Sequence, residues 1–516
     1  MKKITRLFGL FIILLVVAAA CSKESYEPST PTTPTTPTTP TTPTTPTISS
    51  EIQYATQFAK DVLENYYLWN KEIASSISSS LDPETCTDPV ATVEKIRYKQ
   101  GGGYKSKQDE DRWTQLFEDV TPFQESVQGV ETTNGMSLSV GTFNDTTPQA
   151  YFFIVNFVYA DSPAAKAGLK RGDYITTYNG EDITQANLNA AYYGETTATY
   201  GLAVKTAEGY IQDTGEEVTL NAVKMYLDPI VCSKAFDVAG KKVGYLMYDS
   251  FDLDSAEKLI DVCKDFKNQG VTELILDLRY NGGGYVLTEN LLASMLAPAD
   301  KVEQKALYQQ EIYNSILTQA WSKDDKDFNK TFFSFDHEIN KKKLSTKDAN
   351  IGLNKIYAIV TGNTASASEA ILVGLNPYID LVTIGQRSYG KYCTGFILDA
   401  GQVYEKAPSV ISKWGIYVMI TTYADCDNNN LARPVGIDPD VEAKDSPMDG
   451  YPLGDENETM LKAALMAAGK SYTPLATTRA LDNTPQMELK MLRNKYKFGK
   501  RILQMPTKFK QEIEER

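Results

Sequence analysis

The chain has 516 residues, 42% hydrophobic and 23% charged, which are ordinary proportions for a globular protein of about three domains. Its formal net charge of −14 argues against nucleic acid as a partner, because phosphate groups would be repelled. One histidine, His337, and six dispersed cysteines show neither a zinc-ligand pattern nor a disulfide framework, so we expect no metal and no cofactor.

Residues 1–20 have the pattern of an export signal. Three basic residues precede an apolar run, Leu10 to Val17, that is too short to span a membrane. The small residues that follow end at Cys21, an arrangement that resembles a bacterial lipobox. The resemblance implies a lipidated Cys21 that anchors the protein in the cell envelope, at the outer membrane on its periplasmic or surface-exposed side. An ordinary secretory signal cleaved near Ala20 is the alternative.

Residues 21–48 are predicted to be a tether. Ser29 to Thr47 repeats Pro-Thr-Thr, and a proline repeat without apolar residues favours an extended spacer over a packed core. Nineteen such residues, at about 3.1 Å each, would span roughly 60 Å.

Residues 49–130 are expected to form a small helical domain. Glu51 to Leu68 carries apolar residues at helical spacing, and Asp109 to Phe117 continues the region. Its tyrosines and tryptophans are interpreted as core residues.

The next module, residues 131–228, is predicted to be rich in β-strands. Phe152 to Val158 indicates a strand, Asp161 to Gly168 a short helix, and Leu169 to Gly180 a turn, a strand and an Asn-Gly hairpin. This series resembles a PDZ domain. The resemblance implies that a loop of four residues caps the C-terminus of a peptide that adds a strand to the sheet edge. These residues are Gly135, Met136, Ser137 and Leu138; a simple strand start is the alternative.

A glycine-rich turn follows a buried strand in the third module. Glu273 to Arg279 predicts the strand, and Tyr280 to Gly284 leads into a helix that begins near Val286. Glycines there allow backbone N–H groups to face a developing oxyanion, although a plain strand-to-helix turn is the alternative.

Ser366 and Lys391 are predicted to lie on one edge of a parallel sheet. Lys355 to Val360 is a predicted strand, Ser366 to Leu375 a helix, and Leu381 to Ile384 a second strand, with Lys391 in the loop beyond it. Because parallel strands end on the same edge, both residues would meet where open α/β sheets place their sites. An ordinary helix cap with a solvated lysine is the alternative.

A lysine can act as the base of a serine hydrolase if its pKa falls. The ordinary value of about 10.4 must drop by about 3 units for a base that works near neutrality. Burial in an apolar pocket can supply that shift.

Four segments together resemble the C-terminal-processing, or tail-specific, serine peptidases of the Ser/Lys type. They are Asp277 to Gly284, Ala365 to Glu369, Gly390 to Tyr392, and Gly436 to Asp440, the last expected on a late strand. The resemblance implies a layered α/β (ClpP/crotonase-like) peptidase domain over residues 229–470. The fold class expected for the whole chain is therefore multidomain α+β and α/β.

The same resemblance implies the catalytic roles. Ser366 would be the nucleophile, Lys391 the general base, and the N–H groups of Gly283 and Ala367 the oxyanion donors. In the family, a glutamine four residues after the lysine commonly orients it, and here that position is Gly395. The group that orients Lys391 is therefore a backbone atom or a residue the motifs do not reveal.

Two further segments are interpreted from composition. Residues 301–350 are a predicted insertion in which His337 is structural. Residues 471–516 hold ten basic and five acidic residues and are expected to be a solvated helical extension that docks on the acidic body. A membrane-surface or substrate-guiding role for this extension is the alternative.

These features predict a lipid-anchored serine endopeptidase that cleaves proteins or peptides with accessible C-terminal tails. An inactive relative that only binds tails is the first alternative. A Ser/Lys amidase or β-lactam-reactive enzyme is the second, and it is disfavoured because Glu369 stands where its Ser-x-x-Lys pattern requires lysine. Oligomeric state is left open.

Overall fold

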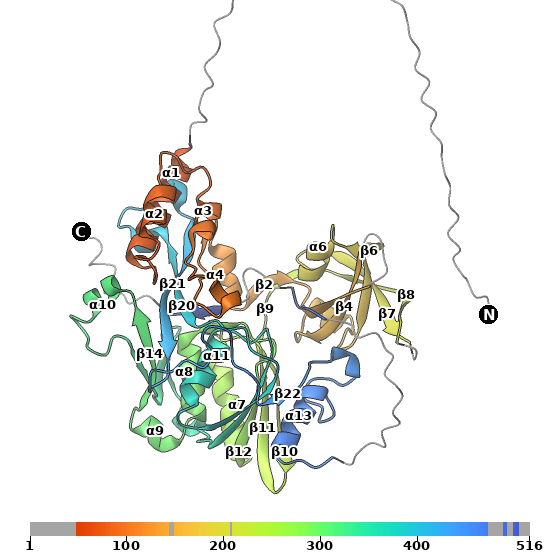
Figure 1. The fold of residues 1–516 in the computed structure, drawn as a ribbon. Helices are drawn as coiled ribbons and strands as arrows, with labels where there is room; N and C mark the ends of the chain where they lie inside the picture. The colour runs from red at the N-terminus through yellow and green to blue at the C-terminus, as the bar shows by residue number, and fades with distance from the viewer. Residues whose placement is uncertain (1–47, 144–148, 207–208, 473–488, 493–498, 505–516) are drawn as a thin grey trace, which may run out of the picture. The chain divides into compact units, whose positions relative to one another are not determined.

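The computed structural model describes residues 48–143, 149–206, 209–472, 489–492 and 499–504 (Figure 1). The predicted signal peptide, Cys21 and nearly all of the predicted tether lie outside these described residues. Within the described part, no helix is both long enough and apolar enough to cross a membrane.

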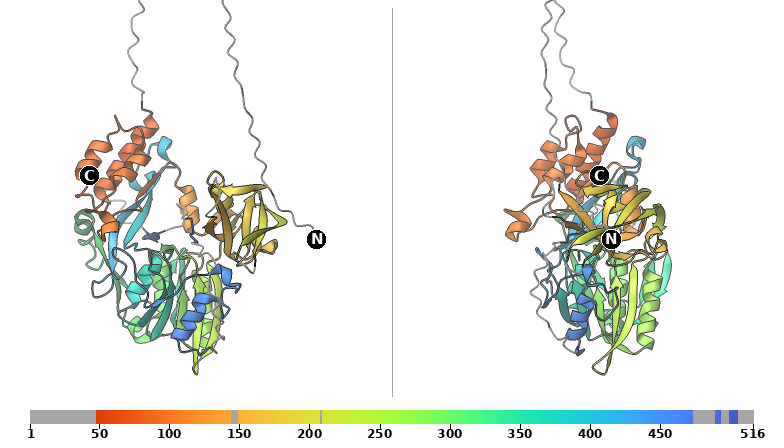
Figure 2. Two further views of the ribbon diagram at one scale, coloured as in Figure 1. Left: turned by 45° about the vertical axis from the view of Figure 1, so that its right-hand side comes forward. Right: turned by 90° about the vertical axis from the view of Figure 1, so that its right-hand side faces the viewer.

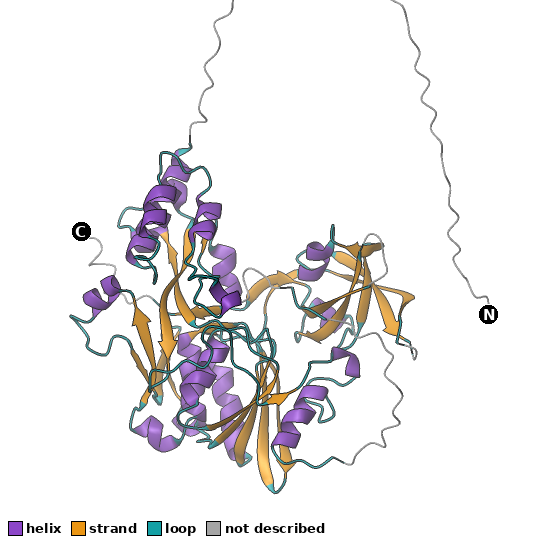
Figure 3. Ribbon diagram, viewed as in Figure 1, coloured by secondary structure: helices purple, strands orange, loops and turns teal. Residues whose placement is uncertain are grey.

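The N-terminal module is mainly helical, as expected, and its apolar side chains join the core of the third module (Figure 3). One segment differs: Gln115–Phe117 forms strand β1, which pairs antiparallel with β21 (Gly415–Ala424). The helices are α1 (Ser50–Asn65), α2 (Ala74–Ser80), α3 (Pro89–Ile96) and α4 (Thr121–Val127).

The second module is the predicted β-rich one. A six-stranded sheet in the order β3-β4-β6-β5-β7-β8 carries β3 at one edge. The predicted Asn179-Gly180 hairpin joins β5 to β6, with both residues at positive φ. The elements are β2 (Val130–Thr133), β3 (Met136–Thr142), β4 (Ala150–Val158), α5 (Pro163–Lys166), β5 (Tyr174–Tyr178), β6 (Glu181–Thr184), α6 (Leu188–Tyr193), β7 (Ala198–Lys205), β8 (Ile211–Leu220) and β9 (Val223–Tyr226).

The third module contains the predicted parallel unit. A six-stranded sheet in the order β10-β11-β12-β18-β19-β22 is parallel except for β10. Its strands are β10 (Ile230–Val238), β11 (Lys241–Tyr248), β12 (Val271–Asp277), β18 (Lys355–Val360), β19 (Asp380–Gly385) and β22 (Val441–Glu442). The segment Gly436 to Asp440, expected on a late strand, is instead a loop before β22, so that expectation was wrong.

Helices cover both faces of this sheet (Figure 2). Alternate side chains of β11, β12 and β18 pack either on the core shared with α7, α8 and α11 or on the cluster that contains α13. The helices are α7 (Ala256–Asn268), α8 (Val286–Leu296), α9 (Ala299–Glu303), α10 (Ser315–Trp321), α11 (Ala367–Leu375), α12 (Ala400–Val403) and α13 (Thr459–Ala467).

A second sheet, in the order β13-β23-β20-β21-β14-β15, takes in both the glycine turn and the C-terminal segment. Its other strands are β13 (Gly283–Tyr285), β14 (Leu307–Tyr313), β15 (Lys330–Phe332), β20 (Cys393–Asp399) and β23 (Lys500–Ile502). The hairpin β16 (Asp336–Ile339) and β17 (Lys342–Ser345) stands apart and carries His337, whose Nε2 lies 2.8 Å from the Ser334 carbonyl oxygen.

The C-terminal segment corrects a sequence-based expectation. Residues 471–516 were expected to be a solvated helical extension, but β23 is a buried strand between β13 and β20. Arg501 is fully buried because Glu289 and Glu311 neutralise its charge at 2.8 and 2.6 Å.

Candidate active site

Ser366 stands at the start of α11 in a strained backbone conformation. Its φ of 66° and ψ of −114° lie outside the regions that non-glycine residues normally adopt. Strain of this kind costs about 1–3 kcal/mol and is concentrated at functional sites. The residue is fully buried, and its hydroxyl has no hydrogen-bond partner among the described residues. Ser366 therefore carries an uncommitted hydroxyl at the predicted sheet edge.

The Glu369 carboxylate joins Ser366 to the loop that carries Lys391. It accepts hydrogen bonds from the backbone N–H groups of Ser366 at 2.9 Å, Gly390 at 2.6 Å and Lys391 at 2.8 Å, and from the Ser388 hydroxyl at 2.5 Å. Burial raises the pKa of Glu369 to about 7, against the lowering effect of these donors. Glu369 thus fixes the two predicted catalytic residues as neighbours through their backbones.

Lys391 is completely buried. Its Nζ donates to the Tyr417 hydroxyl at 2.7 Å and to the Gly499 carbonyl at 2.5 Å. The rings of Trp113 and Tyr417 lie 5.3 and 4.7 Å from the nitrogen. Burial lowers the pKa of Lys391 from 10.5 to about 7, which is the shift that a base near neutrality requires.

The other hydrogen bond of the Tyr417 hydroxyl determines which group donates in its contact with Lys391 Nζ. Its hydroxyl must donate to the Arg501 carbonyl, at 3.0 Å, because a carbonyl oxygen can only accept. The hydroxyl therefore accepts from Lys391 Nζ. A neutral amine has two N–H bonds and one lone pair, and both N–H bonds are used here. The lone pair remains available to take a proton.

Gly283 and Ala367 flank Ser366. Gly283 has a φ of 106°, and a Cβ atom built there would lie 2.9 Å from Ser366 Cβ and 2.1 Å from the Lys500 carbonyl oxygen, so only glycine fits. Its N–H donates to Asn281 Oδ1 at 2.8 Å. Ala367 is the first residue of α11, where an N–H group has no intrahelical acceptor. Both predicted oxyanion donors therefore lie next to the predicted nucleophile, and the N–H group of Gly283 is bonded to the Asn281 side chain.

Strand β21 leaves no room at Gly395 for the glutamine that the resemblance led us to expect. A Cβ atom at Gly395 would lie 2.5 Å from the Tyr417 ring and 2.8 Å from the Val418 carbonyl oxygen. Gly395 instead pairs with Ile502 of β23. The groups that hold Lys391 are Tyr417 and the Gly499 carbonyl, which sequence reasoning missed. No local sequence pattern marked Tyr417, because it contacts Lys391 only when β21 pairs with β20.

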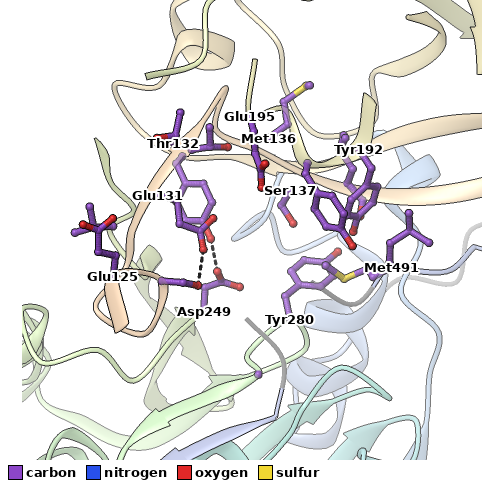
Figure 4. Close-up of a pocket in the computed structure, with 18 of the residues that line it drawn as sticks. Glu125, Glu131, Thr132, Met136, Ser137, Tyr192, Glu195, Asp249, Tyr280 and Met491 are labelled. Atoms are coloured by element: carbon purple, nitrogen blue, oxygen red, sulfur yellow. Dashed lines mark hydrogen bonds between the residues drawn. The ribbon is translucent and has the colours of Figure 1, made fainter. Parts of the chain in front are cut away.

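The predicted tail-binding loop borders a cavity of about 550 Å³ (Figure 4). Met136, Ser137 and Leu138 line it, together with Gly282 of the glycine turn. Gly135 is not a lining residue: it packs against Ser162, with no room for a Cβ atom. Its N–H donates to Thr133 Oγ1 at 3.0 Å. The cavity thus extends from the β3 edge to the turn beside Ser366.

The Asp277 to Arg279 motif has a structural use. Arg279 is fully buried and donates to Asp277 and Glu458, at 2.7–3.0 Å. Arg171 of the β-rich module reaches the same Glu458 at 3.2 Å.

Among the described residues, no cluster of His, Cys, Asp and Glu side chains could hold a metal ion. Cys393, two residues after Lys391, is buried, and burial raises the pKa of its thiol.

Comparisons with known proteins agree with this description. Residues 242–443 match the model of peptidase family S41, and residues 154–195 match the PDZ domain model. The carboxyl-terminal-processing protease of Picosynechococcus sp. is 24% identical over 336 residues, which cover 64% of this chain and 70% of that protein. The carboxy-terminal processing protease CtpB of Bacillus subtilis is 24% identical over 332 residues, which cover 61% of this chain and 59% of that protein.

A solved structure shares the fold. A Bacteroides fragilis protein, provisionally named an S41 protease, superposes with a TM-score of 0.59 at 22% identity, over 80% of this chain and 96% of that one. The chain is thus a peptidase, with one region that matches the PDZ domain and another that matches the serine peptidase family S41.

Proposed function

We propose that this peptidase is a C-terminal-processing serine endopeptidase that uses Ser366 and Lys391 as its catalytic dyad. The observation that supports it most is the Lys391 amine, buried with a lowered pKa and with both N–H bonds taken by Tyr417 and Gly499. A neutral amine held in this way keeps its lone pair free to accept a proton, which is what a general base requires.

The chemistry proceeds through an acyl-enzyme. Ser366 Oγ attacks the scissile carbonyl carbon while its proton passes to Lys391 Nζ. The oxyanion that forms is stabilised by the N–H groups of Ala367 and of Gly283, the latter exchanging Asn281 for the new partner. The C–N bond then breaks, and Lys391 gives its proton to the leaving amine. Water, deprotonated by Lys391, attacks the ester, and the proton returns to Ser366.

In this proposal, the PDZ domain selects the substrates. A protein C-terminus adds a strand to the β3 edge, with its carboxylate at Gly135 to Leu138. The cavity that joins this loop to Gly282 then leads the preceding chain toward Ser366. Capture of the tail raises the local concentration of the scissile bond.

Location in the cell envelope belongs to the same proposal. Cys21 after a short apolar run would carry the lipid, and the repeat from Ser29 to Thr47 would hold the enzyme away from the membrane. Replacement of Cys21 by serine should move the protein from the membrane to the soluble fraction. Continued membrane association of Cys21→Ser would contradict lipid anchoring.

The catalytic proposal is tested with two variants and two controls. Ser366→Ala and Lys391→Ala should each abolish cleavage of an unfolded model protein and leave the far-UV spectrum unchanged. Ser412→Ala and Lys413→Ala replace the same residue types at exposed positions and should keep wild-type rates. Substantial turnover by either catalytic variant would refute the assignment.

A further inference from the structure

The chain's own C-terminal segment lies on the edge of the PDZ sheet. The Val140 N–H donates to the Lys490 carbonyl at 2.6 Å, and the Lys490 N–H donates back to the Val140 carbonyl at 2.9 Å. The two residues form an antiparallel bridge. Val140 belongs to β3, whose other side is paired with β4. A peptide that pairs in this way adds a strand to the sheet.

Side chains of this segment also pack as those of a bound peptide would. Leu492 packs against the PDZ core that contains Leu138 of β3 and Ala191 of α6. Leu489 packs against a second cluster that contains Phe152 and Ile154. Backbone pairing and apolar contacts therefore hold the same four residues, 489–492.

The segment lies where the proposed function places a substrate tail. In the antiparallel register, Leu492 comes opposite Leu138, and the chain runs toward Met136. Met491 and Leu492 line the same cavity as Met136 and Ser137 (Figure 4). A substrate tail and this segment cannot occupy the β3 edge together.

We propose that residues 489–492 are an internal ligand of the PDZ domain, which a substrate tail must displace before it can bind. The proposal rests on the assigned role of Gly135 to Leu138. The internal ligand also lies close in sequence to the Lys391 contact. Six residues separate Leu492 from Gly499, whose carbonyl oxygen accepts a hydrogen bond from Lys391 Nζ. The resting enzyme thus carries its own competitor at the tail-binding site.

Covalent attachment determines the size of the effect. A ligand that belongs to the same chain as its domain can reach an effective concentration of about 1 mM. With an intrinsic dissociation constant of about 100 µM, it would weaken the binding of any competing tail about tenfold.

Binding of a peptide probe tests this competition without turnover. The probe is a fluorescein-labelled peptide of residues 487–492 that ends in the free carboxylate of Leu492, and the protein is the full chain with Ser366→Ala. In this background, Lys490→Pro removes the N–H donor of the bridge, and Leu492→Asp removes the apolar contact. Lys490→Arg keeps both the N–H and the charge and is the matched control.

Fluorescence anisotropy should show that Lys490→Pro and Leu492→Asp each bind the probe about tenfold more tightly than the parent, while Lys490→Arg does not differ from it. Equal affinity of all four proteins, or no binding by any, would overturn the proposal. The readout requires no cleavage. A failure of the proposed peptidase chemistry would therefore appear only in the Ser366 and Lys391 assays.

Discussion

The amine of Lys391 donates a 2.7 Å hydrogen bond to the hydroxyl of Tyr417, and this contact fixes the direction of the amine. Tyr417 is itself held by the backbone of Arg501, to which it donates at 3.0 Å and from which it accepts at 3.1 Å. The C-terminal strand β23 therefore fixes the hydroxyl that fixes the lysine.

Tyr417→Phe should lower kcat about tenfold, with little change in KM, because the Lys391 lone pair loses its fixed direction while substrate contacts remain. The lost hydroxyl also accepts from the charged form of the amine, so its removal should lower the pKa of Lys391 further. The acidic limb of the kcat profile should then move to lower pH. Tyr404→Phe, which removes a hydroxyl bonded to Asp61, is the control and should leave the profile unchanged.

Lys391→Met should raise thermal stability while it abolishes activity. The pKa of Lys391 is about 7 in the folded protein and near its ordinary 10.5 when unfolded, so the unfolded chain binds more protons between these values. The buried lysine therefore destabilises the fold most at and below pH 7, and this cost disappears as the pH rises toward 10.5. Unfolding midpoints measured across this range should show a gain for the variant that shrinks with pH. A gain independent of pH would contradict a burial-shifted lysine.

Gly395→Gln, which restores the residue common in the family, should inactivate the enzyme. Its Cβ atom would lie 2.5 Å from the Tyr417 ring, so Tyr417 or its strand β21 must move. We expect loss of peptidase activity and a lower unfolding midpoint. Wild-type activity in this variant would show that Tyr417 and Gly499 are not the groups that orient Lys391.

Arg501→Met should destabilise the protein by about 3–5 kcal/mol, because two buried carboxylates, Glu289 and Glu311, lose their partner. Burial already raises the pKa of Glu311, although Arg501 acts in the opposite direction. The loss of stability in Arg501→Met should therefore be smaller at low pH, where the Glu311 carboxyl is protonated and needs no charged partner. Denaturant titrations at two pH values measure both effects. Arg387→Met removes an exposed ion pair with Asp438 and should cost less than about 1 kcal/mol.

Local sequence patterns predicted much of the fold around Ser366 and Lys391. The strands and helix around Ser366 were correctly predicted because their apolar residues repeat at the spacing of buried elements, and β18 and β19 are parallel as expected. The glycine turn also lies beside Ser366, since both follow neighbouring parallel strands.

The elements that the sequence did not predict depend on distant pairing. Tyr417 contacts Lys391 only through the β20–β21 pairing, and Arg501 is neutralised by Glu289, 212 residues earlier in the chain. Basic residues in a short C-terminal segment favour a solvated extension when their partners are unknown. Periodicity and composition carry no information about such partners.

The proposed dyad of Ser366 and Lys391 is tested most directly by the rate at which a serine-directed fluorophosphonate labels Ser366, measured by mass spectrometry of the Ser366 peptide. The account predicts that the rate rises with pH through a midpoint near 7, as Lys391 loses its proton, and that Lys391→Met removes the labelling. Labelling of Ser366 that is independent of pH and unaffected by Lys391→Met would contradict a lysine base.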